Sequence, residues 1–116
     1  MKISSLKLNS QFRRLYKKGK SVVTPTMVIY TAKNREDNIR LGITAGKKVG
    51  GAVERNRAKR RIRELFRESV PDLKNGYDFC IVARAFAVKA PYQKLVYDFN
   101  TSLKKLGMWI DEKDFD

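Results

Sequence analysis

The chain has 116 residues, and its 26 lysines and arginines outnumber its 12 aspartates and glutamates, which gives a formal net charge of +14. Its length predicts one domain, and its 42% of hydrophobic residues is typical of a folded globular protein. It contains no histidine, which excludes serine triads and most zinc sites, and its single cysteine forms no internal disulfide. No apolar run approaches the ~18 residues that cross a bilayer. We therefore expect a cytoplasmic protein whose positive field attracts a polyanion.

Positive charge belongs to the body of the chain and not to its end. Residues 1–20 carry seven basic residues and no acid, and residues 47–67 carry nine basic residues against two glutamates. Residues 111–116 hold four of the twelve acids and one lysine. We therefore expect one domain over residues 1–110, followed by an acidic, frayed tail over residues 111–116.

The first half of the chain predicts a short helix followed by strands. Asn9 or Ser10 caps a helix that runs to Lys18, and Gly19 ends it. Alternating apolar residues then indicate strands, and the segment NREDN at 34–38 predicts a hairpin turn between the last two. The expected strands span residues 21–23, 26–33 and 39–45.

The second half predicts two helices separated by a buried strand. A long helix covers residues 52–69 and ends before Pro71, and the apolar run at 78–83 is typical of a strand buried on both faces. The last helix begins at Pro91, and Gly107 closes its apolar stripe. The resulting order, α-β-β-β-α-β-α, predicts a single-domain α+β sandwich of helices on a sheet.

The helix over residues 52–69 has two opposite faces when its residues are placed at about 100° intervals. The apolar face, expected to pack on the core, consists of Ala58, Ile62, Leu65, Phe66 and Ser69. On the other side, Arg60, Arg63 and Arg67 lie in line with no acid among them. Such arginines repel one another in a free protein, whereas guanidinium groups bind phosphate bidentately and stack on bases. This face therefore favours nucleic-acid contact over a merely solvated surface.

No arrangement of acids or thiols predicts an active site on this chain. Most acids outside the tail are isolated or lie beside arginines. Glu64 and Glu68 could share a metal ion at i, i+4 spacing, but ion pairing along the helix is the commoner role. Cys80 lies in the most apolar strand and is expected to be a small core residue. We therefore expect no catalytic residue, no metal site and no cofactor held by the protein.

The segment KKVGGAVERNRAKRRIRELFR at residues 47–67 resembles the signature of the bacterial ribonuclease P protein family, in which an RNR triplet precedes further basic residues. The segments NSQFRRLYKKG, VIYTAKN, IRLGITAGKK and YDFCIVARA resemble the family in order and spacing. The resemblance thus covers nearly the whole chain except the acidic tail. Gly51 and Glu54 depart from the family pattern, and such departures could alter local RNA contacts without undoing the assignment.

The resemblance implies a fold like domain 2 of ribosomal protein S5, with a left-handed βαβ crossover through the basic helix. It also implies an accessory subunit of an endoribonuclease, a hydrolase whose catalytic centre lies on RNA. Such a subunit binds the catalytic RNA and the 5′ leader of precursor tRNA, and it assists removal of the leader to give mature tRNA 5′ ends. The implied partners are these two RNAs, and Mg²⁺ is expected to bind the RNA and not the protein. Neither a membrane nor DNA is expected as a partner.

Two sets of site residues follow from the resemblance. The set facing the catalytic RNA consists of Arg55, Asn56, Arg57, Lys59, Arg60, Arg61, Arg63 and Arg67. In the leader-binding cleft, Phe12, Tyr16 and Tyr30 would stack unpaired bases, although Phe12 fits the core stripe of the first helix equally well. The cations that would pair with leader phosphates are Arg13, Lys17, Lys20, Lys33 and Lys47.

Three other classes of protein are alternatives to this interpretation, and a structural RNA-binding protein is the first of them. A structural RNA-binding protein, such as a ribosomal protein, shares the basic helix and even the implied fold. A DNA-binding protein would lay that helix in the major groove, but no second helix of a helix-turn-helix pair and no dimerising heptad is visible. A stand-alone nuclease lacks candidate catalytic residues. Increased cleavage of precursor tRNA by the catalytic RNA at low magnesium would separate the first class from a ribonuclease P subunit.

Overall fold

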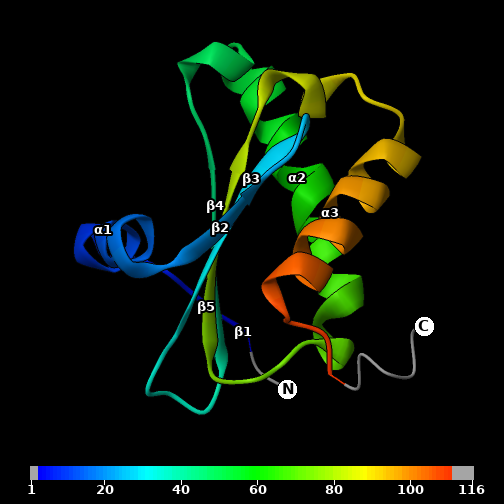
Figure 1. Ribbon diagram of the computed structural model, residues 1–116. Helices are drawn as coiled ribbons and strands as arrows, with labels where there is room; N and C mark the ends of the chain where they lie inside the picture. The colour runs from blue at the N-terminus through cyan, green and yellow to red at the C-terminus, as the bar shows by residue number, and fades with distance from the viewer. Residues whose placement is uncertain (1–2, 111–116) are drawn as a thin grey trace.

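The computed structural model describes residues 3–110, so the expected acidic tail at 111–116 lies outside the described residues (Figure 1). The strands are β1 (Ile3–Ser5), β2 (Lys20–Val23), β3 (Met27–Lys33), β4 (Ile39–Ala45) and β5 (Tyr77–Ala83). The α-helices are α1 (Asn9–Lys18), α2 (Ala52–Ser69) and α3 (Tyr92–Leu106). Three short 3₁₀ helices are η1 (Lys47–Val49), η2 (Val70–Asp72) and η3 (Ala85–Val88). Within residues 3–110, no helix combines the length and apolar character needed to span a membrane.

The sheet separates two unequal layers. Figure 1 shows α2 and α3 on one face of the sheet and α1 on the other. The main core lies under α2 and α3, where Phe66, Phe79 and Phe99 are fully buried. A smaller cluster lies under α1 around Leu15 and Cys80. The predicted α+β sandwich is confirmed, and the short α1 covers only part of its face.

The predicted apolar faces of the two long helices pack on the sheet. The buried residues of α2 are Ala58, Ile62, Leu65 and Phe66, with Ser69 half-buried. The buried hydrophobic residues of α3 are Leu95, Phe99, Leu103 and Leu106. These stripes face the same core, so the outer face of α2 is left to solvent.

β5 occupies the centre of the sheet, whose strand order is β1-β4-β5-β3-β2. It pairs parallel with β4 and antiparallel with β3. The turn at 34–38 therefore does not join paired strands, and the predicted hairpin is wrong. β5 is apolar from Phe79 to Ala83 and almost entirely buried on both faces, as predicted, and a central position between β3 and β4 buries it better than an edge would.

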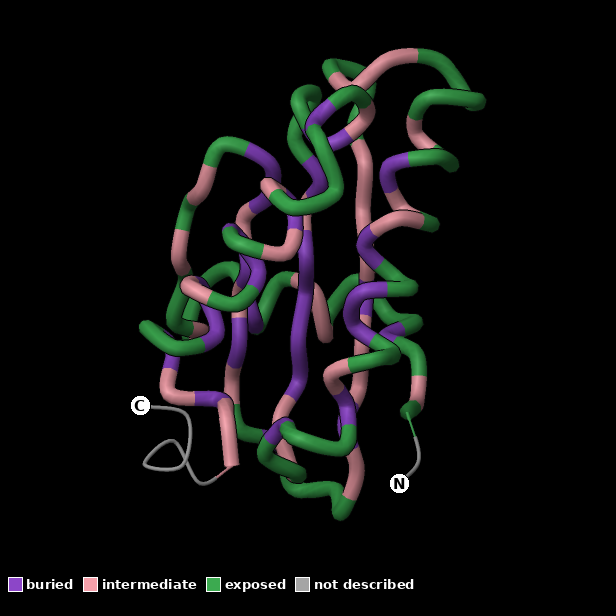
Figure 2. The backbone as a smooth tube through the Cα atoms, turned by 90° about the vertical axis from the view of Figure 1, so that its right-hand side faces the viewer, coloured by how far each residue is buried: buried purple, intermediate pink, exposed green. Residues whose placement is uncertain are grey.

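The crossover from β4 through α2 to β5 joins two parallel neighbouring strands. β4 runs upward in Figure 1, and the same upright molecule is seen from its helix side in Figure 2. In that view β1 lies on the right, so the strand order places β5 to the left of β4. The crossover is therefore left-handed, as the resemblance implied and contrary to the usual right-handed rule.

The N-terminal region differs from its prediction in two details. The described residues begin with the three-residue strand β1, parallel to β4, and not with a helix. Such a short strand shows no readable alternation in the sequence. Neither Asn9 nor Ser10 caps α1, because the side-chain Oε1 of Gln11 accepts the backbone N–H of Leu8 at 3.0 Å instead.

Gly19 ends α1, as predicted, for a steric reason. A Cβ atom at this position would lie 2.5 Å from the carbonyl oxygen of Leu15 and 2.9 Å from that of Thr31. The chain therefore passes from α1 into β2 closely enough to need a residue without a side chain. This close passage sets the position of α1 against the sheet.

Candidate nucleic-acid interface

The outer face of α2 carries three exposed arginines, Arg60, Arg63 and Arg67, which we call the basic ridge. Among residues 3–110, no carboxylate lies within ion-pairing distance of these guanidinium groups. The buried stripe on the opposite side of α2 fixes the rotation of the helix, so the ridge faces solvent. Its charge is therefore available to a partner.

Arg57 and Arg61 lie on another side of α2 and bind the protein itself. Arg61 donates from Nη1 to the carbonyl oxygen of Ala87 and from Nη2 to that of Ala90, both at 2.7 Å. Arg57 donates from Nε to the carbonyl oxygen of Val88 at 3.1 Å. Partial burial and the charge of Arg57 lower the pKa of Arg61. These bonds tie α2 to η3, so the two arginines have a structural contact that the sequence did not predict.

The other predicted RNA contacts flank the ridge. Asn56 is exposed, and Arg55 and Lys59 are partly buried. The Nε of Arg55 donates to the carbonyl oxygen of Gly51 at 3.4 Å, which holds that side chain near the N-terminus of the helix. Asn56 therefore continues the ridge at i−4 from Arg60, and Lys59 lies at its border, whereas Arg55 lies at the N-terminal end of the buried stripe, three residues before Ala58.

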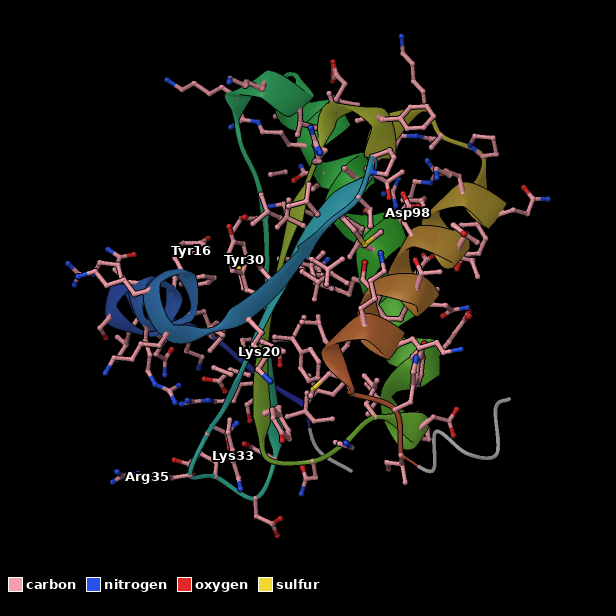
Figure 3. All side chains as sticks on the ribbon, viewed as in Figure 1. Tyr16, Lys20, Tyr30, Lys33, Arg35 and Asp98 are labelled. Atoms are coloured by element: carbon pink, nitrogen blue, oxygen red, sulfur yellow. The ribbon has the colours of Figure 1, made fainter. Side chains whose placement is uncertain are left out.

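A hollow of about 500 Å³, which we call the α1 hollow, lies between α1 and β4. Phe12, Arg13 and Tyr16 line it from α1, and Thr44 lines it from β4. Tyr16 is 44% exposed, and its ring meets that of Tyr30 edge to face with centroids 4.9 Å apart (Figure 3). The three predicted aromatic residues are thus brought together.

Phe12 lies both in a core cluster and at the edge of a hollow. It packs against the cluster around Leu15 and also lines the α1 hollow. Its ring lies over Gly42, where an added Cβ atom would approach Cε1 of the ring to 2.5 Å. A glycine in β4 therefore lets this ring approach the strand closely.

A second hollow, of about 540 Å³, lies between η1 and η3, and we call it the η hollow. Val82, which lines it, packs with the cluster under α1, whereas Ala83, which also lines it, belongs to the main core, so this hollow lies at the end of the sheet. Lys47 belongs to the η hollow and not to the α1 hollow. Three further lining residues were not predicted, although the run RAF after the buried strand combines charge with an aromatic ring; they are Lys48, Arg84 and Phe86.

The remaining predicted cleft cations are spread more widely. Arg13 lines the α1 hollow, and Lys17 is exposed on α1. Figure 3 shows Lys33 beside Arg35, at the end of the sheet away from Tyr16. Lys20 is exposed at the start of β2. The structure therefore groups Arg13 with the aromatic residues, whereas Lys33 lies apart from them.

The aromatic wall of the α1 hollow is uncharged at neutral pH. Burial is the main cause that raises the pKa of Tyr16 to about 12, and a hydrogen bond with Cys80 is the second cause. Burial also raises the pKa of the Cys80 thiol, which lies 3.6 Å from the Tyr16 hydroxyl. A neutral ring suits contact with bases, which carry no charge of their own.

These raised pKa values predict that the free energy of unfolding falls as pH rises above about 9. The Cys80 thiol ionises near its ordinary pKa of 9.0 in the unfolded chain but stays protonated in the folded protein. The stabilisation is complete below the unfolded pKa and is lost as pH rises through the folded pKa. Urea unfolding between about pH 7 and pH 10 measures this effect. We expect a smaller fall in Cys80→Ala, and equal falls in both proteins would contradict the assignment.

The buried carboxylate of Asp78, for which the sequence predicts no partner, anchors α1 to the sheet. Asp78 is fully buried, and Arg40 donates to it from Nε at 2.6 Å and from Nη2 at 2.7 Å. Arg14 of α1 reaches the same carboxylate at 3.5 Å, and Asn34 donates to it at 2.8 Å. Across residues 3–110, no three potential acidic or thiol ligands are grouped closely enough to hold a metal ion.

Comparison with known proteins identifies relatives over almost the whole chain. A family model described as Ribonuclease P matches residues 1–107. The ribonuclease P protein component of Clostridium botulinum is 38% identical over 110 residues, which cover 94% of this chain and 99% of the relative. That of Clostridium kluyveri is 42% identical over 111 residues, with the same coverage of 94% and 99%.

Solved structures agree with these sequence relatives. The ribonuclease P protein of Staphylococcus aureus superposes with a TM-score of 0.83 at 35% identity, covering 94% of this chain and 100% of that one. The ribonuclease P protein of Thermotoga maritima superposes with a TM-score of 0.74 at 28% identity, covering 84% and 93%. The similarity therefore includes both sequence and fold.

Proposed function

The chain belongs to the ribonuclease P protein family, and from this premise we propose that it binds the catalytic RNA of ribonuclease P and the 5′ leader of precursor tRNA. It assists the endonucleolytic removal of the leader in the cytoplasm, which gives mature tRNA 5′ ends. The catalytic centre and its Mg²⁺ lie on the RNA partner. The observation that carries this proposal is the uncompensated basic ridge on the same small domain as two hollows with aromatic residues.

The basic ridge is the proposed contact with the catalytic RNA. Its arginines displace counterions from phosphates, and each bidentate guanidinium–phosphate pair adds orientation as well as affinity. Asn56 and Lys59 extend this surface along α2, and Arg55 adds positive charge at the N-terminal end of the helix. Arg57 and Arg61 contribute by holding η3 against the helix, through their hydrogen bonds to its carbonyl oxygens.

The α1 hollow and the η hollow are the proposed path of the leader. Aromatic faces stack on any base, so a cleft of this kind accepts leaders of different sequence. Arg13 at the α1 hollow and Lys47 at the η hollow supply positive charge for the leader phosphates. By holding both RNAs, the protein lowers their mutual repulsion and orients the cleavage site, without itself breaking a bond.

Reconstitution with the catalytic RNA tests this function. Adding the protein at low magnesium should increase the rate of precursor-tRNA cleavage, because the protein replaces part of the charge screening that magnesium provides. A structural RNA-binding protein would bind RNA without changing this rate. The same assay therefore separates the two functions, and no increase in cleavage at low magnesium would overturn the proposal.

The substitution Tyr16→Ala is expected to weaken binding of leader-bearing precursor tRNA about tenfold, since one base–aromatic stack contributes ~1–3 kcal/mol. Binding of mature tRNA, which has no leader, should stay unchanged. Filter binding of both RNAs to the reconstituted holoenzyme measures the difference. Tyr16→Phe keeps the ring and is the matched control, with near-normal binding expected. Equal losses for precursor and mature tRNA would remove Tyr16 from the leader site.

A further inference from the structure

A third hollow, of about 340 Å³, lies at an open edge of the sheet, between α1 and the basic ridge, and we call it the edge hollow. Leu6, Leu41 and Ile43 are among its apolar lining residues, and Arg63 and Arg67 line it from α2. Phe12 lines both the edge hollow and the α1 hollow, so its ring lies between the two. No acidic side chain lines the edge hollow.

The backbone of β4 is open where it borders this hollow. β1 ends at Ser5, and Leu6 donates its backbone N–H to the carbonyl oxygen of Leu41 at 3.0 Å. The polar backbone groups of Leu41 thus point away from β5, and those of Ile43, two residues on, point the same way. Among residues 3–110, no backbone hydrogen bond from the β1 side reaches Ile43. One N–H donor and one C=O acceptor therefore face the hollow side by side.

Three properties of the edge hollow match an unpaired nucleotide. Apolar side chains offer a surface for the flat face of a base, and the open backbone of Ile43 offers a donor beside an acceptor. Every nucleobase carries a donor beside an acceptor on its pairing edge. The guanidinium groups of Arg63 and Arg67 lie where they can pair with flanking phosphates. The volume is at the lower end of the ~300–1,000 Å³ typical of small-ligand pockets, which suits one base.

We propose that the edge hollow holds the base of one unpaired nucleotide of the catalytic RNA, hydrogen-bonded to the backbone of Ile43. This inference rests on the proposed function, because it assigns the ridge to that RNA. The other occupant that an open strand edge attracts is a peptide strand, including one from a second copy. A peptide would leave two arginines without an anionic partner, so the charge of the hollow favours RNA.

The substitution Ser5→Phe tests the proposal by filling the hollow from its rim without changing a charge. Affinity for the catalytic RNA should fall about tenfold, as expected when one base is no longer bound, while the slope of affinity against salt stays unchanged. Arg60→Gln is the matched control, because Arg60 belongs to the ridge but does not line the hollow. It should lower the salt slope by about one and leave the hollow occupied.

Chemical probing of the catalytic RNA identifies the occupant directly. Dimethyl sulfate reports the pairing edges of adenine and cytosine, and a carbodiimide reports those of guanine and uracil. One unpaired base should be protected by the wild-type protein and by Arg60→Gln, and it should become reactive with Ser5→Phe. Unchanged affinity and unchanged protection with Ser5→Phe would overturn the proposal.

Hydrogen exchange of the Ile43 amide in the wild-type protein provides a test that needs no variant. The amide should exchange quickly in the free protein and slowly in the complex with the catalytic RNA. Slow exchange in the free protein that depends on its concentration would identify a strand of a second copy and overturn the proposal. Failure of the wild-type protein to bind the RNA at all would instead overturn the proposed function, so the two failures are distinguishable.

Discussion

Replacing the whole basic ridge by glutamine is expected to weaken binding to the catalytic RNA by about 100-fold or more, since each charge-assisted hydrogen bond contributes ~1.5–3 kcal/mol. The slope of log affinity against log salt should fall by about three, one for each phosphate that the variant no longer neutralises. The reason lies in the geometry of α2, where Arg60, Arg63 and Arg67 face solvent and have no carboxylate partner in the described part of the chain. Titrations at several salt concentrations measure both quantities.

The control for this variant removes the same amount of charge from another part of the surface. Lys74, Lys89 and Lys105 are exposed and line none of the three hollows. Their combined replacement by glutamine should lower affinity only slightly, because diffuse charge contributes less than a direct pair with phosphate. If both triple variants show the same fall in affinity and in salt slope, net charge and not the ridge attracts the RNA.

The surface of α2 could be predicted from the sequence because a helix is a local structure. The period of about 3.6 residues places Ile62 and Phe66 on one side and Arg63 on another, whatever the rest of the chain does. The burial of the first two and the exposure of the third confirm this inference. The alternation of β3, with Ile29 buried in the main core and Tyr30 facing α1, was predictable for the same reason.

Features that join distant segments could not be predicted in this way. Asp78 meets Arg40 and Arg14, which are 38 and 64 residues away in the sequence, so it appeared to be isolated. The pairing of β3 and β4 was predicted from the turn between them, whereas the buried β5 lies between these strands. The edge hollow forms because β1 ends early beside α2. No local sequence pattern predicts that these two distant segments lie close together.

The substitution Asp78→Asn is expected to lower the free energy of unfolding by about 3 kcal/mol, the lower end of the ~3–5 kcal/mol range for removing one partner of a buried ion pair. The lower end applies because the side chain of Arg40 is 20% exposed, whereas that of Asp78 is fully buried. Without the carboxylate, this guanidinium stays partly buried and loses the only ion pair that it forms within the described residues. Removing the ion pair with Arg14 also frees α1 from the sheet, so leader binding should weaken together with stability.

Urea unfolding measures the stability, and hydrogen exchange of the α1 amides measures how firmly that helix is held. Asp72→Asn removes an exposed acid and serves as the control, with a change within about 0.5 kcal/mol. The double variant with Arg40→Gln should be more stable than Asp78→Asn alone, because it removes the uncompensated charge. If the double variant is instead less stable by the sum of the two single effects, the pair does not act as a unit. The position of α1 would then depend on the packing of Phe12 on Gly42 and of Leu15 in its cluster.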